Sequence, residues 1–439
     1  MKKYINIVIP SVFLVLAITF QSCLKDSCSD VQTYTQWNPV YKTDAEMNVA
    51  PTFEVARQLQ NPGKIYFYDN YLLINEQKKG IHIIDNSNVK SPKNIGFIKI
   101  DGNIDIAIKE DMLYVDSYDD LLAIDITNIT APKLANRINA VFPTTFWRDP
   151  QKGWLVDYTP SKVTREIECT DPRLGNYGWG RGWFNEGDVL YATNSKSFDV
   201  ALGSTPSVSA RPAGVGGSLA RFTLVSDYLY TVDQTSLKTF SISSLNKPVL
   251  SNTISFGWGI ETIFPNKDKL FLGSTTGLFI IDIANPIAPK LLSNFTHARK
   301  CDPVFVDGNL AYVTLNGGGG CGGVGSQLDV IDITSLTQPK LLKTYPMKQP
   351  KGLSVLEKTL YLCDDGLKIF DVTNSQSIDQ NLKAHIKGFD SYDVISFSEN
   401  INNVKQKIAM VIGADGFTQL DVTDPLSPKE LSKISVIKQ

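Results

Sequence analysis

The chain has 439 residues, with 43 Lys and Arg against 45 Asp and Glu, which gives a formal net charge of −2 at pH 7. A protein that binds nucleic acid through its phosphates needs a basic excess or a basic face to neutralise them. The balanced composition therefore argues against nucleic acid as a partner.

The N-terminal residues 1–22 have the pattern of a signal peptide. Two lysines precede an apolar run of 16 residues, 5–20, which is short for a membrane span of ~20 residues but suits a signal peptide. The run ends at Ser22-Cys23, which resembles a lipoprotein signal and implies acylation of Cys23. An ordinary secretory signal cut nearby is the alternative, and it would also export the chain.

Residues 23–51 are expected to form a polar tether behind the lipid. The pair Lys25-Asp26 resembles the surface-export signals of some Gram-negative lineages. We therefore expect an outer membrane lipoprotein that touches the membrane through its N-terminal lipid only. It would lie on the periplasmic or the cell-surface side, and the sequence does not decide which.

The pattern within residues 104–138 predicts four short antiparallel strands. Apolar runs rich in β-branched and aromatic residues alternate there with turns of Asp, Asn, Ser and Pro, which is typical of strands joined by tight turns. The four runs cover residues 104–109, 112–115, 121–126 and 133–138.

One phrase, an apolar run that ends in Asp and is followed by a Pro, recurs along the chain. Its Asp positions are Asp85, Asp125, Asp282, Asp332, Asp371 and Asp421, and a seventh copy has Ser241 in that place. Outside one irregular segment the copies are 39 to 50 residues apart, which is the size of a four-stranded propeller blade. A single blade cannot bury both of its faces, so the units must stack in a ring.

The phrase resembles the repeat of the LVIVD family of β-propeller surface proteins. Seven copies can be matched, at residues 64–100, 104–139, 219–255, 260–296, 301–346, 350–387 and 390–436. The resemblance implies an all-β propeller of four-stranded antiparallel blades within residues 52–439. It also implies a bacterial or archaeal envelope protein without an agreed activity. Seven blades are expected, with six or eight as alternatives, and Thr52–Arg57 is a candidate closing strand from the N-terminus.

The repeated Asp invites two interpretations, metal ligand or turn cap. Asp at the end of a strand commonly accepts a hydrogen bond from the backbone two residues on, and Ser241 could do the same. We favour turn caps, and we predict neither a metal site nor a cofactor.

Residues 140–218 lack the repeat and are expected to form a Trp-rich insertion after blade two, with a decayed eighth blade as the alternative. The insertion should share one rim with the loops between second and third strands. Its aromatic and Arg side chains could bind sugar rings or a protein, or they could form a small core of the insertion itself. The candidate binding face consists of Trp147, Arg148, Tyr177, Trp179, Arg181, Trp183, Trp258 and His297.

Two cysteines flank a Gly-rich loop, and their predicted positions in one blade favour a disulfide. Cys301 opens a first strand, and Cys321 lies in the loop 317–325 between the second and third strands, so both should lie on one rim. A disulfide there would restrain the loop. The pairing of Cys28, Cys169 and Cys363 stays open.

Alignment of the units places one residue of each at the mouth of the central channel. These residues are Lys64, Asp105, Arg221, Glu261, Asp302, Lys351 and Asp393. A ring of mixed sign can bind a polar ligand, although such rings are more often solvated and mutually paired.

The chain shows no catalytic motif, and it has only three histidines, His82, His297 and His385. We therefore predict a non-enzymatic envelope lipoprotein whose propeller binds a glycan or an envelope protein. One alternative is a glycan-processing enzyme that uses Asp302 with Glu261 or Asp393 as its carboxylate pair. The other is a structural subunit of an envelope complex.

Overall fold

The apolar runs of the repeat form strands in the computed structural model, which describes residues 29–142, 147–168, 214–296, 303–317, 325–401 and 404–437. The chain divides into two units. Unit 1 consists of residues 1–40 and 157–193, and unit 2 of residues 41–156 and 194–439. Among the described residues, no helix is long and apolar enough to span a bilayer.

The described part of unit 1 lies in two long strands that continue into unit 2. These are β1 (Ser29–Lys42) and β12 (Gly153–Glu168), and β12 also pairs with the short strand β11 (Arg148–Asp149). Within unit 1 the strands are joined by side chains as well, because Asn38 Nδ2 donates to Ser161 Oγ at 2.8 Å. A short helix, α2 (Asp44–Met47), follows β1 and is capped by Thr43 and Glu46.

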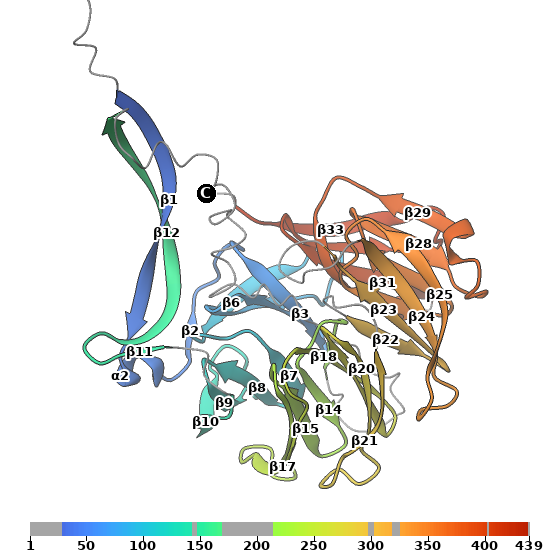
Figure 1. Ribbon diagram of the computed structural model, residues 1–439, viewed down its shortest axis with the longest axis horizontal. Coiled ribbons are helices and arrows are strands. Elements are labelled where there is room, and N and C mark those ends of the chain that lie inside the picture. Colours follow the sequence, from blue (N-terminus) through green and yellow to red (C-terminus); the bar gives the residue numbers. More distant parts are fainter. Residues whose placement is uncertain are drawn as a thin grey trace, which may run out of the picture. The chain divides into compact units, whose positions relative to one another are not determined.

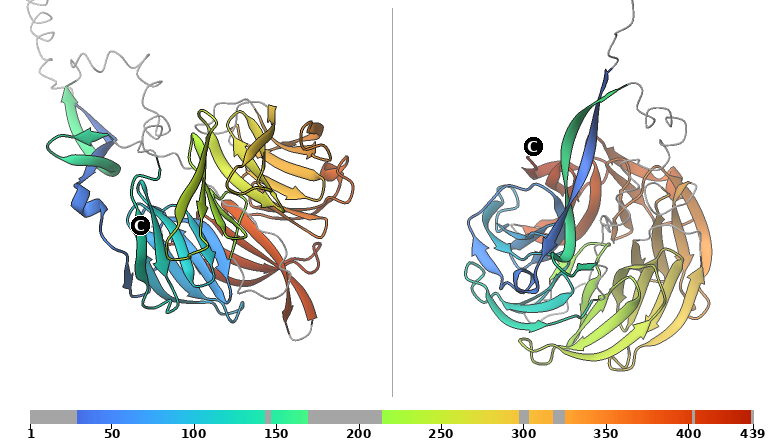
Figure 2. Two further views of the ribbon diagram at one scale, coloured as in Figure 1. Left: turned by 90° about the horizontal axis from the view of Figure 1, so that it is seen from below. Right: turned by 60° about the vertical axis from the view of Figure 1, so that its left-hand side comes forward.

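Unit 2 contains seven sheets that follow one another around an axis (Figures 1 and 2). Blades one to three consist of β3 (Pro62–Tyr68), β4 (Tyr71–Glu76), β5 (Gly80–Asp85) and β6 (Lys93–Lys99); β7 (Ile106–Lys109), β8 (Met112–Ser117), β9 (Asp120–Asp125) and β10 (Lys133–Ile138); and β14 (Phe222–Val225), β15 (Tyr228–Val232), β16 (Ser236–Ser241) and β17 (Val249–Ser255).

The other four blades have the same order. They consist of β18 (Ile260–Asn266), β19 (Lys269–Ser274), β20 (Gly277–Asp282) and β21 (Lys290–Thr296); β22 (Val304–Asp307), β23 (Leu310–Leu315), β24 (Ser326–Asp332) and β25 (Lys340–Met347); β26 (Leu353–Leu356), β27 (Thr359–Cys363), β28 (Leu367–Asp371) and β29 (Leu382–Ile386), which the 3-10 helix η4 (Ile378–Gln380) precedes; and β30 (Ser391–Ile401), β31 (Val404–Gly413), β32 (Gly416–Asp421) and β33 (Lys429–Ser435). The prediction of an all-β propeller with four-stranded antiparallel blades is confirmed.

The repeat sets the details of each blade. In all seven, the ladder between the third and fourth strands contains one register shift, as between Ile83 and Ile84. A bulge of this kind increases the local twist. Apolar residues of neighbouring blades then pack face to face, as in the cluster of blades one and two around Leu73 and Leu113.

Two features depart from a plain ring. The strand β2 (Thr52–Glu54) pairs with β6 on the outer edge of blade one, so it does not close the ring as a shared strand. Instead, the first and last blades are joined by side chains, because Asn86 and Gln419 exchange two hydrogen bonds and Phe67 stacks on Phe397 at 5.1 Å. Just before blade one, Leu59 also forms a parallel backbone bridge with Val436, which follows the last strand of blade seven.

The described part of the insertion does not form an eighth four-stranded blade. Its strands β11 and β12 form a sheet with β1, and its last strand β13 (Val215–Gly216) pairs with β3 on the inner edge of blade one. Because β3 is the innermost strand of its blade, β13 lies inside the ring of blades. The sequence did not predict this position.

Candidate functional site

The six described members of the predicted mouth ring lie at the start of the innermost strands, but half of them are not solvated. Lys64 is 5% exposed, Asp105 1% and Asp393 0%. Arg221, Glu261 and Lys351 are half-buried, and Asp302 lies outside the described residues. The interpretation as a solvated channel entrance is therefore wrong for Lys64, Asp105 and Asp393.

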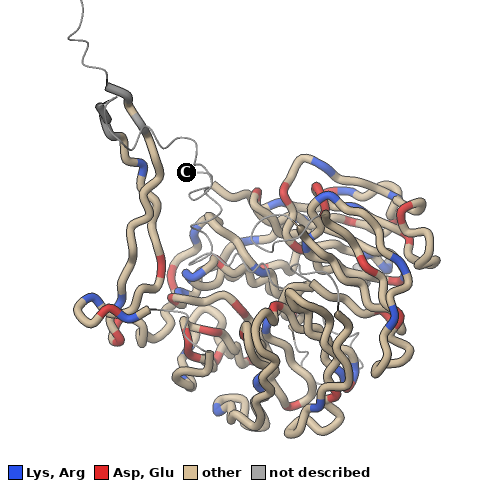
Figure 3. Tube along the Cα trace, viewed as in Figure 1, with Lys and Arg blue, Asp and Glu red and all other residues tan. Residues whose placement is uncertain are grey.

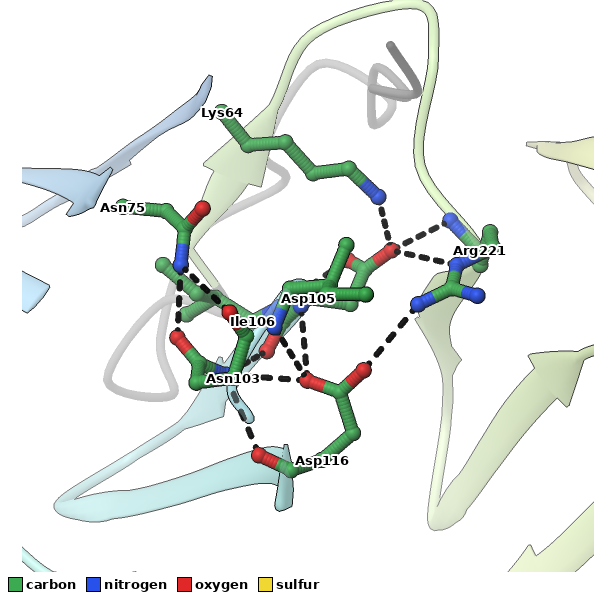
Figure 4. A network of polar contacts seen from close by, with 8 residues as sticks. Lys64, Asn75, Asn103, Asp105, Ile106, Asp116 and Arg221 are labelled. Carbon is green, nitrogen blue, oxygen red and sulfur yellow. Dashed lines mark hydrogen bonds and ion pairs between the residues drawn. The ribbon is translucent and has the colours of Figure 1, made fainter. Parts of the chain in front are cut away.

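Three blades meet in a buried polar network around Asp105 (Figure 4). Lys64 Nζ of blade one donates to Asp105 Oδ2, and the backbone N–H of Arg221 donates to the same oxygen at 2.9 Å. The guanidinium of Arg221 also donates to Asp116 Oδ2 at 3.0 Å. Two cations thus face two carboxylates, which is the arrangement that makes buried charges tolerable.

Asp116, at the end of the second strand of blade two, organises the backbone below this network. Its Oδ1 accepts hydrogen bonds from Ile104 N at 2.7 Å, Asp105 N at 2.8 Å and Asn103 Nδ2 at 2.9 Å. Burial raises the pKa of Asp116, while the charge of Arg221 opposes that rise. Asp116 was not among the predicted site residues. In the strand register its position corresponds to Asn75 of blade one, whereas the acidic residues Glu76, Asp233 and Asp364 lie one position later, where blade two has Ser117.

The segment 214–220 fills the centre of the ring and contacts five blades. Gly214 N donates to Ile108 O of blade two at 3.0 Å, and Val215 and Gly216 pair with β3 of blade one. Farther along, Ser218 Oγ accepts from Leu353 N of blade six at 2.8 Å and donates to Asp393 of blade seven. Ala220 O accepts from Ile263 N of blade four at 2.8 Å.

This segment runs from one end of the innermost strands to the other. β3 runs from the end where Lys64 lies towards Phe67, and Val215 pairs with Phe67 while Gly216 pairs with Tyr66. The chain therefore rises antiparallel to β3 towards Asp393 and Arg221. We had expected the insertion to lie on the rim of the loops between second and third strands. Its last residues instead run along the axis, starting from the opposite rim.

Asp393 contacts this segment directly. Its Oδ1 accepts hydrogen bonds from Ser218 Oγ at 3.1 Å and from Ser218 N at 3.4 Å. Its Oδ2 has no hydrogen-bond partner among the described residues. Burial raises the pKa of Asp393 to about 7, against the opposing effects of these hydrogen bonds and of Lys64.

The aspartates of the repeat are turn caps, as predicted. Each accepts a hydrogen bond from the backbone N–H two residues on, at 2.8 to 3.0 Å, in Asp85, Asp125, Asp282, Asp332, Asp371 and Asp421. Ser241 lies 3.2 Å from the hydroxyl of Ser243. Within the described ranges, no group of three or more His, Cys, Asp or Glu side chains is arranged to hold a metal ion.

The histidines and cysteines add little to the candidate site. His82 is fully buried, as predicted, and its Nε2 lies 3.0 Å from Glu76 Oε2. Cys363 is a buried free thiol. The predicted disulfide between Cys301 and Cys321 lies outside the described residues. So do Cys23, His297, Tyr177, Trp179, Arg181 and Trp183.

The described aromatic residues of the predicted binding face fall into two places. Trp147, which is 57% exposed, precedes Arg148, whose guanidinium donates to Asp44 Oδ2 at 2.9 Å. The ring N–H of Trp154 donates to the other oxygen of Asp44 at 2.7 Å. Trp258, in the link from blade three to blade four, is 69% exposed.

The Trp258 link is held to the end of blade three. Phe256 N donates to Thr235 O at 2.9 Å, and Gly259 N donates to Gln234 O at 2.8 Å. Phe256 packs inward against Phe279, with ring centroids 5.2 Å apart. The indole of Trp258 is thereby presented to solvent from a fixed backbone, at the rim where second strands end.

Lys and Arg positions are interspersed with Asp and Glu positions along the trace of the blades (Figure 3). Many form local pairs, such as Lys358 with Asp307 at 2.7 Å.

Comparison with known proteins identifies the repeat. Residues 63–97, 103–140 and 271–297 match the family described as LVIVD repeat, so the predicted LVIVD repeats are confirmed in these segments. The other copies remain predictions as LVIVD repeats, although each corresponds to a four-stranded sheet. No curated protein sequence matches the chain.

Solved structures resemble the chain at low identity. The periplasmic gluconolactonase PpgL of Pseudomonas aeruginosa is 11% identical, with a TM-score of 0.48 over 88% of this chain and 97% of that chain. BamB of Moraxella catarrhalis is 8% identical, with a TM-score of 0.45 over 89% and 97%. PorZ of Porphyromonas gingivalis is 10% identical, with a TM-score of 0.44 over 88% and 39%. Likeness at this level carries no inference about ligands or activity.

Proposed function

We propose that this chain is an exported envelope lipoprotein whose propeller is a non-enzymatic binding module for a glycan or an envelope protein. The export part of the proposal is supported by the signal-peptide pattern of residues 1–22 and by Cys23 that follows it. The binding part is supported by the propeller, whose rims bring together links that are far apart in the sequence.

The observation that carries the binding proposal is the exposure of Trp258. A large aromatic ring that is 69% exposed leaves much apolar surface in water, which burial against a partner would remove. Because its backbone is held by blade three, the ring loses little conformational freedom on binding. Trp is also enriched among the residues that dominate binding energy.

The accessibility of the carboxylates favours binding over catalysis. Asp105, Asp116 and Asp393 are at most 3% exposed, and the first two are engaged by Lys64 and Arg221. A glycosidase needs two carboxyl groups that reach the glycosidic bond from opposite sides. Of the predicted carboxylate pairs, Asp302 lies outside the described residues and Glu261 is half-buried. A glycan-processing enzyme therefore remains an alternative to be tested with a polysaccharide panel.

The test of the binding proposal compares Trp258→Ala with Leu426→Ala. Both side chains are 69% exposed, but Leu426 lies in the turn between the third and fourth strands of blade seven, at the opposite rim. We expect wild type and Leu426→Ala to retain the same ligands on a glycan array or in crosslinking with envelope proteins. Trp258→Ala should lose at least tenfold in affinity, since a central aromatic contact contributes ~2 kcal/mol or more.

The outcomes separate the three functions. Equal affinity of both variants would remove Trp258 as the contact residue. Release of products from the glycan panel would establish the enzyme. A stable complex with one envelope protein that both variants retain would favour the structural subunit.

The lipid anchor has its own test. Labelling of cells with a radioactive fatty acid should mark the wild-type chain, and Cys23→Ser should abolish both the label and the recovery of the protein with membranes. Export of an unlabelled wild-type chain would show an ordinary secretory signal instead.

A further inference from the structure

The segment 214–220 behaves as a plug, because it occupies the axis of the ring without belonging to a blade of its own. Its hydrogen bonds to the blades are few: a two-residue ladder with β3, single backbone bonds to Ile108 and Ile263, and the contacts of Ser218. Val215 also packs against the apolar core, and Leu219 and Ala220 are buried. Ser218 is 1% exposed and links blades six and seven. Opening of this segment would therefore break a small number of bonds and bring water to the polar centre.

Asp393 contacts the plug on one side and is packed tightly against Gly352 on another. A Cβ atom built on Gly352 would lie 2.0 Å from Asp393 Oδ1, so glycine is needed there for the carboxyl group to fit. The other carboxyl oxygen, Oδ2, is buried without a hydrogen-bond partner among the described residues. Among the described residues, a charge on this group would be stabilised by hydrogen bonds from Ser218 and the backbone of Val394 and, without a direct ion pair, by the charge of Lys64.

The charges around Asp393 are already matched without it. On β3, Lys64 bonds Asp105, and at the start of β14 Arg221 bonds Asp105 and Asp116. Two cations thus neutralise two carboxylates. Lys351 and Asp390 form a further ion pair, so their charges also cancel.

The remaining titratable neighbour of Asp393 does not supply a cation either. It is Cys363 on β27, whose thiol is held neutral because burial, and next the charge of Asp393, raise its pKa. Ionised Asp393 is therefore an excess negative charge in a dry, balanced site.

We propose that residues 214–220 form a pH-sensitive plug of the propeller channel, and that ionisation of Asp393 loosens it. The sign follows from linkage. Burial raises the pKa of Asp393 to about 7 with the plug in place, and a hydrated Asp has a pKa of ~3.9. The open form thus binds fewer protons between these values, so its population rises with pH there and levels off above 7.

Hydrogen exchange of the plug measures this directly. Exchange of the amides of residues 214–221, divided by the intrinsic rate at each pH, gives the opening constant. We expect that constant to rise by up to about tenfold per pH unit between the two pKa values, and by about 50-fold from pH 5 to pH 7, where the closed form is already half ionised. In Asp393→Asn it should not change with pH, because the side chain no longer ionises.

Two further variants distinguish the latch from general loosening. Ser218→Ala removes the hydroxyl that joins Asp393 to Leu353 N, so its plug should exchange faster at every pH while the pH dependence is retained. Asp329→Asn is the control, because this buried carboxylate accepts from Thr344 at 2.6 Å within blade five. Its plug should behave as in wild type.

The proposal is overturned if the corrected exchange of residues 214–221 is independent of pH in wild type. It is also overturned if Asp393→Asn shows the same pH dependence as wild type, or if the plug exchanges only together with the strands of the blades. Should Asp393→Asn fail to fold, the wild-type profile and Ser218→Ala still decide between these outcomes.

Discussion

The seam between the first and last blades offers a quantitative test of the ring, because no strand is shared across it. Asn86 Nδ2 donates to Gln419 Oε1 at 3.0 Å, and Gln419 Nε2 donates back to Asn86 Oδ1 at 2.8 Å. The two side chains are 4% and 0% exposed. Gln419 Nε2 also lies 3.0 Å from Val89 O, which Ser432 Oγ contacts as well at 2.7 Å.

The magnitude follows from counting the groups left without partners. In Gln419→Ala the carbonyl of Val89 keeps Ser432, but both polar groups of the buried Asn86 amide lose their partner. At 1–3 kcal/mol for each orphaned group, the free energy of unfolding should fall by about 3 kcal/mol. Asn86→Ala orphans only Gln419 Oε1, because Gln419 Nε2 keeps Val89 O and Ser432 Oγ, so it should cost about 1–3 kcal/mol.

The double variant removes both partners and leaves no orphan between them. It should therefore be less destabilised than the sum of the two single variants, by about 1–2 kcal/mol. Urea unfolding of the four proteins, followed by tryptophan fluorescence and circular dichroism, gives this coupling energy. Additivity within about 0.5 kcal/mol would refute the view that this pair closes the ring.

A variant within one blade provides the comparison for the seam. Gln327→Ala loses one hydrogen bond, from Gln327 Nε2 to Asp329 Oδ1 at 2.9 Å, and should cost only about 1 kcal/mol. A loss as large as that of Gln419→Ala would show that the seam has no special weight.

Three further outcomes are expected. The free energy of unfolding of Asp393→Asn should exceed that of wild type by an amount that grows as pH rises from about 4 to 7, up to about 4 kcal/mol, because only wild type has to ionise a buried carboxyl group. Urea titrations at pH 5 and pH 7 measure this difference between the two proteins. An equal difference at both pH values would contradict burial as the cause of the raised pKa of Asp393. Lys64→Met, which leaves Asp105 buried without its ammonium partner, should cost about 3–5 kcal/mol in the same assay, and a loss below 1 kcal/mol would show that Arg221 alone suffices. Gly80→Ala should prevent folding of blade one, because φ at Gly80 is 136° and a Cβ there would lie 2.0 Å from Ile98 O; soluble expression with wild-type circular dichroism would disprove it.

The repeat made the strands and turns predictable because both depend on local chemistry. An Asp that ends a third strand accepts from the N–H two residues on in every copy, and alternating apolar runs bounded by turns can pair only with their neighbours. The same regularity placed Lys64 and Asp105 in adjacent blades, where they form an ion pair.

The burial of that pair was not predictable in the same way. The pair is joined by Arg221, whose backbone N–H donates to Asp105 at 2.9 Å and which follows the irregular insertion, a segment without the repeat. Asp116 was missed because an Asp before a turn looks like any other turn residue. The acidic residues Glu76, Asp233 and Asp364 lie one position later in their strands, so no recurrence at its own position singled it out.

The amino-acid order by itself determined the blade, since strand formation and turn capping act between residues that are close in the chain. It predicted seven units but left six or eight open. The tertiary structure alone decided what occupies the axis and how the ring is sealed. These depend on contacts between residues more than 100 positions apart, such as Ser218 with Asp393 and Asn86 with Gln419, and no local pattern specifies which distant partner a polar side chain will meet.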